Sequence, residues 1–154
     1  MRPPALPGNR TSQEHEMTAV DQDRFRTARD MFAADTASRA LGIEMLELGD
    51  GRAVAAMTVT ETMVNGHGIT HGGYVFLLAD TTFALACNSY GQQAVGARAD
   101  IRYLRPTGAG EILTATASER ARFGRNGLYD VTVTNGAGAI IAEFRGDSRA
   151  VTTA

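Results

Sequence analysis

The sequence of 154 residues contains no lysine, a single cysteine and no long uninterrupted apolar run. All fifteen basic residues are therefore arginines, and with seventeen acidic residues they leave a net charge of -2, which argues against a general nucleic-acid-binding protein. The lone Cys87 excludes a disulfide within the chain and is typical of a reducing compartment. No segment resembles a signal peptide or reaches the roughly 18 apolar residues of a membrane helix. We therefore expect a soluble, cytoplasmic protein with neither a membrane nor a nucleic-acid partner.

Length and charge distribution predict one domain whose second half is the more basic. A chain of 154 residues is long enough to bury a core within a single domain. Residues 1–20 are rich in proline and polar side chains and lack periodicity, so we expect a flexible tail before a domain at residues 21–154. Residues 1–88 hold seven arginines against eleven acids, whereas residues 89–154 hold eight against six. The second half is therefore the better candidate for holding an anionic ligand.

The apolar pattern predicts a helix, a hairpin, a longer helix and then four strands. Residues 21–40 repeat apolar side chains at helical spacing and stop before Gly42. Two strand-like runs follow, joined by Gly49-Asp50-Gly51, which is a strong hairpin signal. The longer helix is predicted to follow a loop at residues 61–70 and to end around residues 88–91. The strand-like segments cover residues 43–48, 52–60, 94–104, 111–122, 128–134 and 139–145.

This order of elements predicts an α+β fold, in which one antiparallel sheet of about six strands wraps a long central helix and a short N-terminal helix precedes them. From Gly73 to Cys87 the only charge is Asp80, so the central helix has no polar face and should be covered by other structure. One sheet covers only one side of it. Because an identical subunit is the simplest cover for the other side, we expect a homodimer.

A pair of glycines stands where the central helix should begin. The backbone N–H groups of Gly72 and Gly73 lie at the positive end of that helix, and no Cβ blocks the approach of a ligand. Such a helix end can bind an anion or polarise a carbonyl oxygen as an oxyanion forms. The alternative is that the two glycines only let the chain turn into the helix.

Asp80 is an isolated carboxylate among apolar residues. An ionised carboxylate is costly to bury unless it is hydrogen-bonded or paired. One interpretation is a structural aspartate whose partners are Thr81, Thr82 or a second subunit. The other is a general base or nucleophile with a modestly raised pKa.

Helix geometry decides how the two features can act together. Asp80 is eight residues beyond Gly72, which is about 12 Å along one helix. A general base must lie within about 3 Å of the water that it activates. The two residues of one chain therefore cannot serve the same carbonyl, whereas Asp80 of one subunit can lie beside Gly72 of another in a two-fold dimer with antiparallel helices. If both residues are catalytic, the active site is shared between subunits.

The available side chains favour thioester hydrolysis. The sequence has no serine nucleophile elbow, and Cys87 lies late in the helix rather than at its head. His67 and His71 lack a third ligand at metal spacing, so we expect no metal. Amide hydrolysis would also require protonation of a poor leaving group. A thiol with a pKa of about 8.5 leaves as a thiolate without that help.

Several motifs together resemble those of hot-dog-fold acyl-CoA thioesterases of the PaaI type, the phenylacetate-degradation thioesterase family. NGHGITHGG begins at Asn65 and FLLADTTFA begins at Phe76. The flanking pieces are ALGI at residues 40–43, YLRP at 103–106, LTATA at 113–117, YD at 129–130 and FRG at 144–146. The resemblance spans about residues 25–151 and implies a helix wrapped by an antiparallel sheet. It also implies a dimer, often doubled to a tetramer, with active sites at the subunit interface.

The resemblance implies roles for individual residues. Asp80 matches the catalytic acid that acts as base or nucleophile, and Gly72 matches the residue whose N–H polarises the thioester carbonyl. Asn65 matches a side chain that orients the carbonyl or the water, and His71 matches a loop residue with a positioning role. Thr81 is next to the acid and is expected to hydrogen-bond it.

Coenzyme A would enter as part of the substrate, so no separate cofactor is expected. Its phosphates suit the fork of donors that arginine presents. The alternative role of arginines on strands is to protect an exposed sheet edge. The positions that match nucleotide-holding segments of similar thioesterases are Arg105, Arg122, Gly124, Arg125 and Arg149.

The expected substrate is phenylacetyl-CoA or a ring-hydroxylated form of it. Two alternatives are a thioesterase for another aryl or medium-chain acyl-CoA and a non-catalytic acyl-CoA-binding module on the same fold. A dehydratase is disfavoured because those enzymes place a histidine and a carboxylate differently. Four aromatic residues are candidates for the acyl site, although aromatic residues beside a helix more often belong to the core; they are Tyr74, Phe76, Phe83 and Tyr103.

Overall fold

The computed structural model describes residues 24–152, which form two short helices, one long helix and six strands. The helices are α2 (Arg26–Ala34), α3 (Thr36–Ala40) and α4 (Gly72–Cys87), with a 3-10 turn η1 (Glu61–Met63) before α4. The strands are β1 (Glu44–Gly49), β2 (Arg52–Thr58), β3 (Ala94–Tyr103), β4 (Ile112–Phe123), β5 (Asn126–Thr134) and β6 (Ile140–Ala150). The expected tail lies outside the described residues. None of the helices in this range combines the length and the hydropathy needed to span a membrane.

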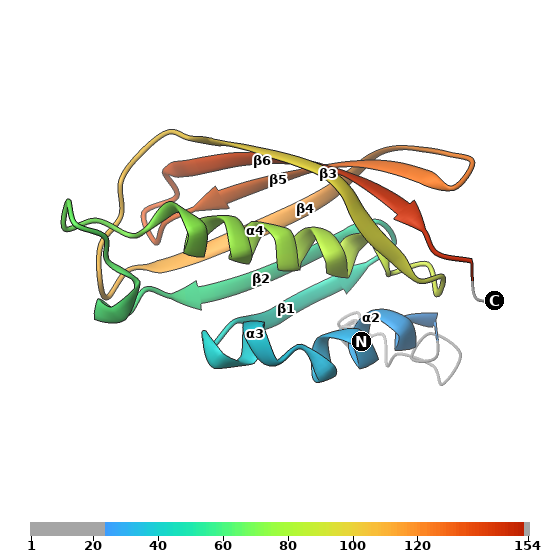
Figure 1. Ribbon diagram of the computed structural model, residues 1–154, viewed down its shortest axis with the longest axis horizontal. Helices are drawn as coiled ribbons and strands as arrows, with labels where there is room; N and C mark the ends of the chain where they lie inside the picture. The colour runs from blue at the N-terminus through green and yellow to red at the C-terminus, as the bar shows by residue number, and fades with distance from the viewer. Residues whose placement is uncertain (1–23, 153–154) are drawn as a thin grey trace, which may run out of the picture.

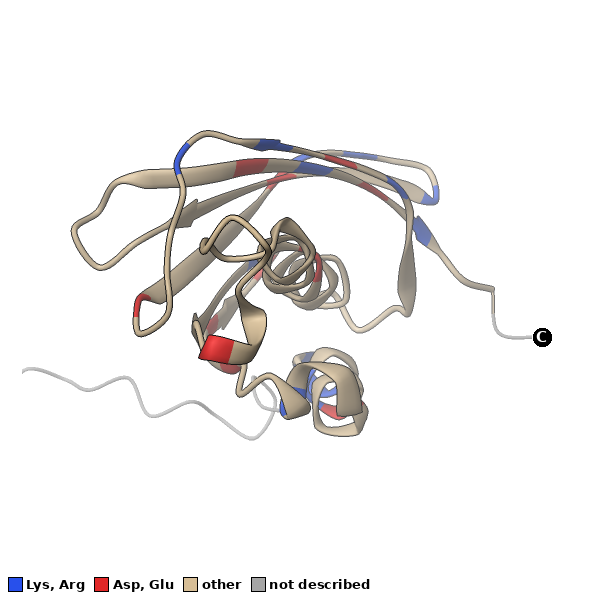
Figure 2. Cartoon of the chain, turned by 60° about the vertical axis from the view of Figure 1, so that its left-hand side comes forward, with Lys and Arg blue, Asp and Glu red and all other residues tan. Residues whose placement is uncertain are grey.

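The six strands form one antiparallel sheet in the order β1-β2-β4-β5-β6-β3. The sheet curves around α4, which lies along its concave side (Figure 1). Figure 2 looks nearly along α4 and shows the strands arching over the helix. The predicted hot-dog fold is confirmed, and the predicted strands are all present. Strand β3 follows α4 in the chain but crosses to the far edge, where β6 is its neighbour.

Helix α4 is covered by the sheet on one side and by α2 and α3 on part of the other. Its buried residues include Leu78, Phe83 and Leu85, which pack in the main core with strands β2, β4, β5 and β6. Gly73 and Asp80 are exposed, and Leu77 is partly exposed, at helical spacing along one stripe. This outward stripe of α4 is the surface that the sheet leaves open.

The structure differs from the sequence prediction at the N-terminal helix, which is broken at Asp35. The Asp35 side chain accepts a hydrogen bond from the Ser38 backbone N–H at 2.9 Å and caps α3. Aspartate is favoured at such a position because its carboxylate satisfies an otherwise unpaired N–H group. The apolar repeat continues across the break, so periodicity alone predicted a single helix.

Strand β6 continues to Ala150, five residues beyond the predicted end at 145. Gly146 is the reason for the early prediction, because glycine usually weakens a strand. Here glycine makes room for the helix: a Cβ on Gly146 would lie 2.9 Å from the Phe83 ring of α4. The ring of Phe83 thus packs directly on the backbone of β6.

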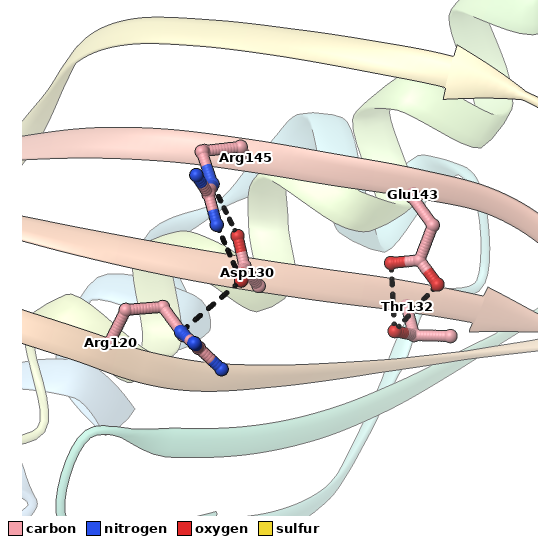
Figure 3. A network of polar contacts seen from close by, with 5 residues as sticks. All are labelled: Arg120, Asp130, Thr132, Glu143 and Arg145. Carbon is pink, nitrogen blue, oxygen red and sulfur yellow. Dashed lines mark hydrogen bonds and ion pairs between the residues drawn. The ribbon is translucent and has the colours of Figure 1, made fainter.

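Charged residues are frequent along the strands of the sheet (Figure 2). Arg145 donates two hydrogen bonds to Asp130, at 2.7 and 2.9 Å, and Arg120 lies 3.5 Å from the same carboxylate. Thr132 donates to Glu143 on the neighbouring strand (Figure 3). These bonds link β4, β5 and β6 across the face that does not touch α4.

The ion pair on this outer face should make stability depend on acid pH. The hydrogen bonds from Arg145 lower the pKa of Asp130 below its ordinary value of 3.8. Because folding lowers this pKa, the pair stabilises the fold above pH 3.8, and the contribution disappears as the pH falls through the lower folded value. We expect Asp130→Asn to reduce the free energy of unfolding by at most about 1 kcal/mol at pH 7.

Urea denaturation of both proteins at several pH values measures the difference. Arg145→Gln removes the partner and should reproduce the same pH-dependent loss. A difference between wild type and Asp130→Asn that stays constant well below pH 3.8 would contradict the assignment.

Candidate active site

The head of α4 presents one unpaired backbone N–H group. His71 caps the helix, because its Nδ1 accepts a hydrogen bond from the Gly73 N–H at 3.0 Å. The Tyr74 N–H donates to the carbonyl of His71 at 3.0 Å. Within residues 24–152, by contrast, the Gly72 N–H has no hydrogen-bond acceptor. His71 therefore caps the first turn and leaves the Gly72 N–H without an intramolecular partner, while its role in positioning a substrate stays a prediction.

Asn65 belongs to the loop that leads into this helix head. Its Oδ1 accepts hydrogen bonds from the backbone N–H groups of His67 and Ile69, at 2.9 and 3.4 Å. The side-chain oxygen thus holds the loop in shape, and the Nδ2 amide is the group left to donate. A cleft of about 530 Å³ opens beside the loop, and Asn65, Gly72, Tyr103 and Arg105 contribute to its walls.

Asp80 lies on the outward stripe of α4, halfway along the helix, and is exposed. Its carboxylate makes no hydrogen bond or ion pair with any residue in the described part of the chain. Although the residue is exposed, its apolar surroundings desolvate the carboxylate, and this raises its pKa above 3.8, with a smaller contribution from the nearby charge of Asp35. An unpaired carboxylate with a raised pKa is suited to accept a proton from water.

The expected hydrogen bonds from the neighbouring threonines to Asp80 are not formed. Thr81 and Ser38 share a buried hydrogen bond of 2.8 Å between their hydroxyl oxygens, and Ser38 in turn donates to Asp35 at 2.6 Å. Thr82 donates to the carbonyl of Leu78 at 2.7 Å. Thr81 therefore joins α4 to α3 and does not contact the acid, because its position on the helix faces α3 rather than the open stripe.

The arginines expected to hold coenzyme A phosphates fall into two places in one chain. Arg105 lies beside the cleft at the head of α4 and donates to the Ile140 carbonyl at 2.7 Å. The others lie near the opposite end of the helix, around the turn between β4 and β5. There the guanidinium of Arg122 stacks 3.6 Å from the ring centre of Tyr90, and Arg125 donates to the Ala150 carbonyl.

Gly124 forms the turn itself, with a φ of 59° that favours glycine. Arg149 is exposed on β6, where it pairs in register with Asn126 of β5. Arg122, Gly124, Arg125 and Arg149 thus lie at the same end of the sheet, although the register places Arg149 on the opposite face from Arg122. Arg105 is separated from them by the length of α4.

The four aromatic candidates for an acyl site do not form one pocket. Phe83 is fully buried and packs against Phe144 and Tyr129. Phe76 is half-buried and contacts Phe144, with ring centres 5.4 Å apart. Tyr74 is half-buried beside His71, and only Tyr103 lines the cleft at the helix head. Phe83 is therefore a core residue, not part of an exposed acyl site.

Within residues 24–152, Cys87 is not part of a nucleophilic arrangement, and neither His67 nor His71 belongs to a metal-binding cluster. Burial raises the pKa of the Cys87 thiol to about 12, so the thiolate is scarce at neutral pH. Among residues 24–152, no three His, Cys, Asp or Glu side chains lie together as a metal site would require. The chemistry available on α4 is thus an N–H donor at its head and a carboxylate at its middle, about 12 Å apart along the axis.

Sequence reasoning missed two residues near these groups, Asp35 and Ser38, and one contact of Tyr103, which it had named only as an acyl-site candidate. Asp35 and Ser38 form the link to Thr81. An aspartate followed three residues later by a serine is compatible with a helix N-cap, so the sequence contained a signal for this pair. The Tyr103 hydroxyl donates to the Gly72 carbonyl at 2.8 Å. No local pattern could reveal that contact, because the residues are 31 positions apart in the chain.

Similar sequences and structures are found among known proteins. A sequence model of the Thioesterase superfamily matches residues 67–142, a stretch that includes Gly72 and Asp80. The acyl-coenzyme A thioesterase PaaI of Escherichia coli strain K12 is 44% identical over 127 residues, covering 82% of this chain and 91% of that protein. The structure of the E. coli PaaI protein from the phenylacetic acid degradation operon aligns with a TM-score of 0.83 at 42% identity, over 87% of this chain and 97% of that one.

A more distant structure contains the coenzyme. A protein of Streptococcus mutans UA159, solved bound to acetyl CoA, is 26% identical and has a TM-score of 0.69, covering 72% of this chain and 90% of that one. The PaaI relative matches most of this chain at an identity that establishes common descent, and its fold is the same. This chain therefore belongs to the thioesterase superfamily, as a thioester hydrolase of the PaaI type with a hot-dog fold.

Proposed function

We propose that this protein hydrolyses phenylacetyl-CoA, or a ring-hydroxylated phenylacetyl-CoA, to the free acid and coenzyme A, with no metal or separate cofactor. The proposal rests on two groups of α4 that have no hydrogen-bond partner within residues 24–152. They are the exposed carboxylate of Asp80 and the backbone N–H of Gly72. The acyl-CoA class is supported by the activity named for the E. coli relative. The phenylacetyl group is supported by that relative's place in the phenylacetic acid degradation operon.

Each group has a defined part in the reaction. The Gly72 N–H donates to the thioester oxygen and stabilises the negative charge that develops there. Asp80 acts in one of two ways: it takes a proton from the attacking water, or its oxygen attacks the carbonyl and the resulting anhydride is hydrolysed. In both routes the C–S bond breaks and coenzyme A leaves as a thiolate. The Asn65 Nδ2 amide orients the carbonyl or the water beside Gly72.

The distance along α4 requires two subunits. Asp80 and Gly72 of one chain are about 12 Å apart, too far for both to act on one carbonyl. A two-fold homodimer with antiparallel α4 helices supplies the missing half of each site. Two surfaces support this arrangement: the outward stripe of α4 and the edge strand β3, where Val95 and Tyr103 are exposed. Pairs of such dimers would form the expected tetramer.

The same dimer would let the arginines act together on coenzyme A. Arg105 lies at one end of α4 and Arg122, Gly124, Arg125 and Arg149 lie at the other. Antiparallel helices bring opposite ends from two chains toward each other, so one nucleotide could contact both groups.

A cytoplasmic location stays a prediction, which rests on the lone cysteine. The cytoplasm is also the compartment in which acyl-CoA substrates are made.

The test is a panel of acyl-CoA substrates with release of free thiol as the readout. We expect phenylacetyl-CoA and its hydroxylated form to give a kcat/KM at least about tenfold above those of benzoyl-CoA and hexanoyl-CoA, since a mismatched pocket costs roughly that factor. A preference for either of the latter would assign another aryl or medium-chain substrate. Binding of every substrate without thiol release would instead indicate a non-catalytic acyl-CoA module.

A further inference from the structure

The end of strand β3 returns to the head of α4 and touches it there. β3 follows α4 in the chain and runs back along it at the edge of the sheet (Figure 1). Its last residue, Tyr103, donates a hydrogen bond from its hydroxyl to the Gly72 carbonyl at 2.8 Å. Tyr103 and Gly72 also line the same cleft with Asn65. A side chain from the sheet edge is thus attached to the first residue of the helix.

A side chain at position 72 would displace the Tyr103 ring from its place against the helix. A Cβ on Gly72 would lie 2.9 Å from both the Cζ and the hydroxyl oxygen of Tyr103. These distances are shorter than carbon and oxygen atoms tolerate without a shift of one partner. The ring of Tyr103 therefore packs on the bare Cα of Gly72.

Backbone conformation does not explain the glycine at this position. The glycines of this chain with a positive φ are at turns, whereas Gly72 is the first residue of α4 and is not among them. Any residue can adopt helical dihedral angles. Within residues 24–152 the nearest obstacle to a Cβ at position 72 is the end of the Tyr103 side chain, so a larger residue there would push the ring aside.

We propose that Tyr103 is a positioning residue of the active site, which holds Gly72 through its carbonyl oxygen and its Cα and thereby orients the head of α4. This inference rests on the proposed role of the Gly72 N–H as the donor to the thioester oxygen. A donor is effective only when it is held in place before the charge develops. The hydroxyl bond and the ring contact together hold the first residue of the helix against the sheet edge.

Two further properties suit Tyr103 to this role. Desolvation raises the pKa of its hydroxyl above the ordinary value of 10.0, so the group stays protonated and can donate throughout the neutral range. The residue is 51% exposed, so its ring also forms a wall of the cleft beside the Gly72 N–H. Tyr103 therefore acts on the donor from the side at which a thioester would approach.

The first experiment removes only the hydroxyl. Tyr103→Phe keeps the ring and should lower kcat by about fivefold with KM within about twofold of wild type, because the donor it positions strengthens its bond in the transition state. Backbone amide exchange by NMR gives a second readout that does not depend on hydrolysis. Exchange at Gly73 and Tyr74, whose N–H groups are bonded to His71, should quicken in the variant.

The second experiment tests the steric part with a double-mutant cycle. Gly72→Ala keeps the backbone N–H but adds the Cβ that meets Tyr103, so kcat should fall at least about tenfold. In a Tyr103→Ala background, the same substitution should cost no more than about twofold. Gly136→Ala is the matched control, because a Cβ there meets nothing within 4 Å, and it should leave activity unchanged.

Each result either supports or overturns the proposal. Equal losses from Gly72→Ala in both backgrounds, or no loss in the wild-type background, would overturn the positioning role. Wild-type exchange rates at Gly73 and Tyr74 in Tyr103→Phe would overturn the hydrogen-bond part. Failure of the proposed function gives a different pattern: if the wild-type protein releases no thiol, amide exchange in the same variants still decides whether Tyr103 fixes the helix head.

Discussion

Replacing Asp80 with asparagine should lower kcat/KM for thioester hydrolysis by roughly a thousandfold, which is typical for loss of a general base or nucleophile. The fold should remain intact, because the Asp80 side chain is exposed and no residue in the described range depends on it for a hydrogen bond. Asparagine preserves the shape of the side chain and removes only its charge and basicity. Thiol release measured over a range of acyl-CoA concentrations, from below KM to saturation, gives kcat/KM for both proteins.

The same variant should be at least as stable as the wild type at neutral pH. Desolvation raises the pKa of Asp80 above 3.8, so the folded state binds its proton more readily than the unfolded state does. The free energy of unfolding therefore falls as the pH rises through the raised value, and Asp80→Asn avoids this cost. The stability gain should vanish below pH 3.8, where the carboxyl is protonated in both states.

Two controls separate chemistry from structure in this experiment. Asp80→Glu retains a carboxylate with a longer reach and should recover part of the activity that asparagine loses. Asp130→Asn removes a carboxylate of the outer sheet face, far from α4, and should leave kcat unchanged. Unfolding of Asp80→Asn at the purification temperature would instead identify Asp80 as a structural residue.

Mixing two inactive variants should restore activity if the active site is shared between subunits. Asp80→Ala damages the middle of α4, and Gly72→Pro damages its head by removing the N–H. A hybrid dimer then has one active site that contains both substitutions and one that contains neither. Because random exchange makes half of the dimers hybrids, an equal mixture should recover about one quarter of wild-type activity.

Proline is suited to position 72 because it is tolerated at the first residue of a helix. The preceding His71 has a ψ of 130°, which is compatible with a following proline. The proline ring would also contact Tyr103. The substitution therefore removes the N–H donor and displaces the head of α4, and both effects act at the same active site of the dimer. The mixture must be unfolded and refolded together to exchange subunits, and each variant treated alone is the control. An inactive mixture that contains hybrid dimers would refute the shared site.

Much of the fold followed from local patterns. The six strands alternate or are bounded by turn residues such as Asp50-Gly51 and Asn135-Gly136, and the structure confirms each of them. Helix α4 was predicted from its apolar run, and it ends at Cys87, just before the predicted end around residues 88–91. What failed was the end of β6, where Gly146 makes space for Phe83 of a distant helix. A requirement of that kind exists only after the chain has folded.

The site was predicted less completely for a similar reason. The sequence identified Asp80 and Gly72 because a charge and a glycine pair are conspicuous in an apolar helix. It could not indicate which side of α4 the sheet covers, since that helix has no polar face to mark the exposed side. The outward position of Asp80, the bond from Thr81 to Ser38 and the contact of Tyr103 with Gly72 all depend on tertiary packing.

The place of β3 in the sheet constrains how the protein can fold during synthesis. β3 is made directly after α4, yet its neighbour β6 is the last strand to be translated. Until β6 has left the ribosome, β3 has no strand to pair with, and the sheet over the apolar helix α4 is incomplete. Contacts between distant segments form slowly, and exposed apolar surface promotes aggregation in the meantime. Truncation within β6 should therefore yield insoluble chains, because the nascent protein depends on its final strand to enclose α4.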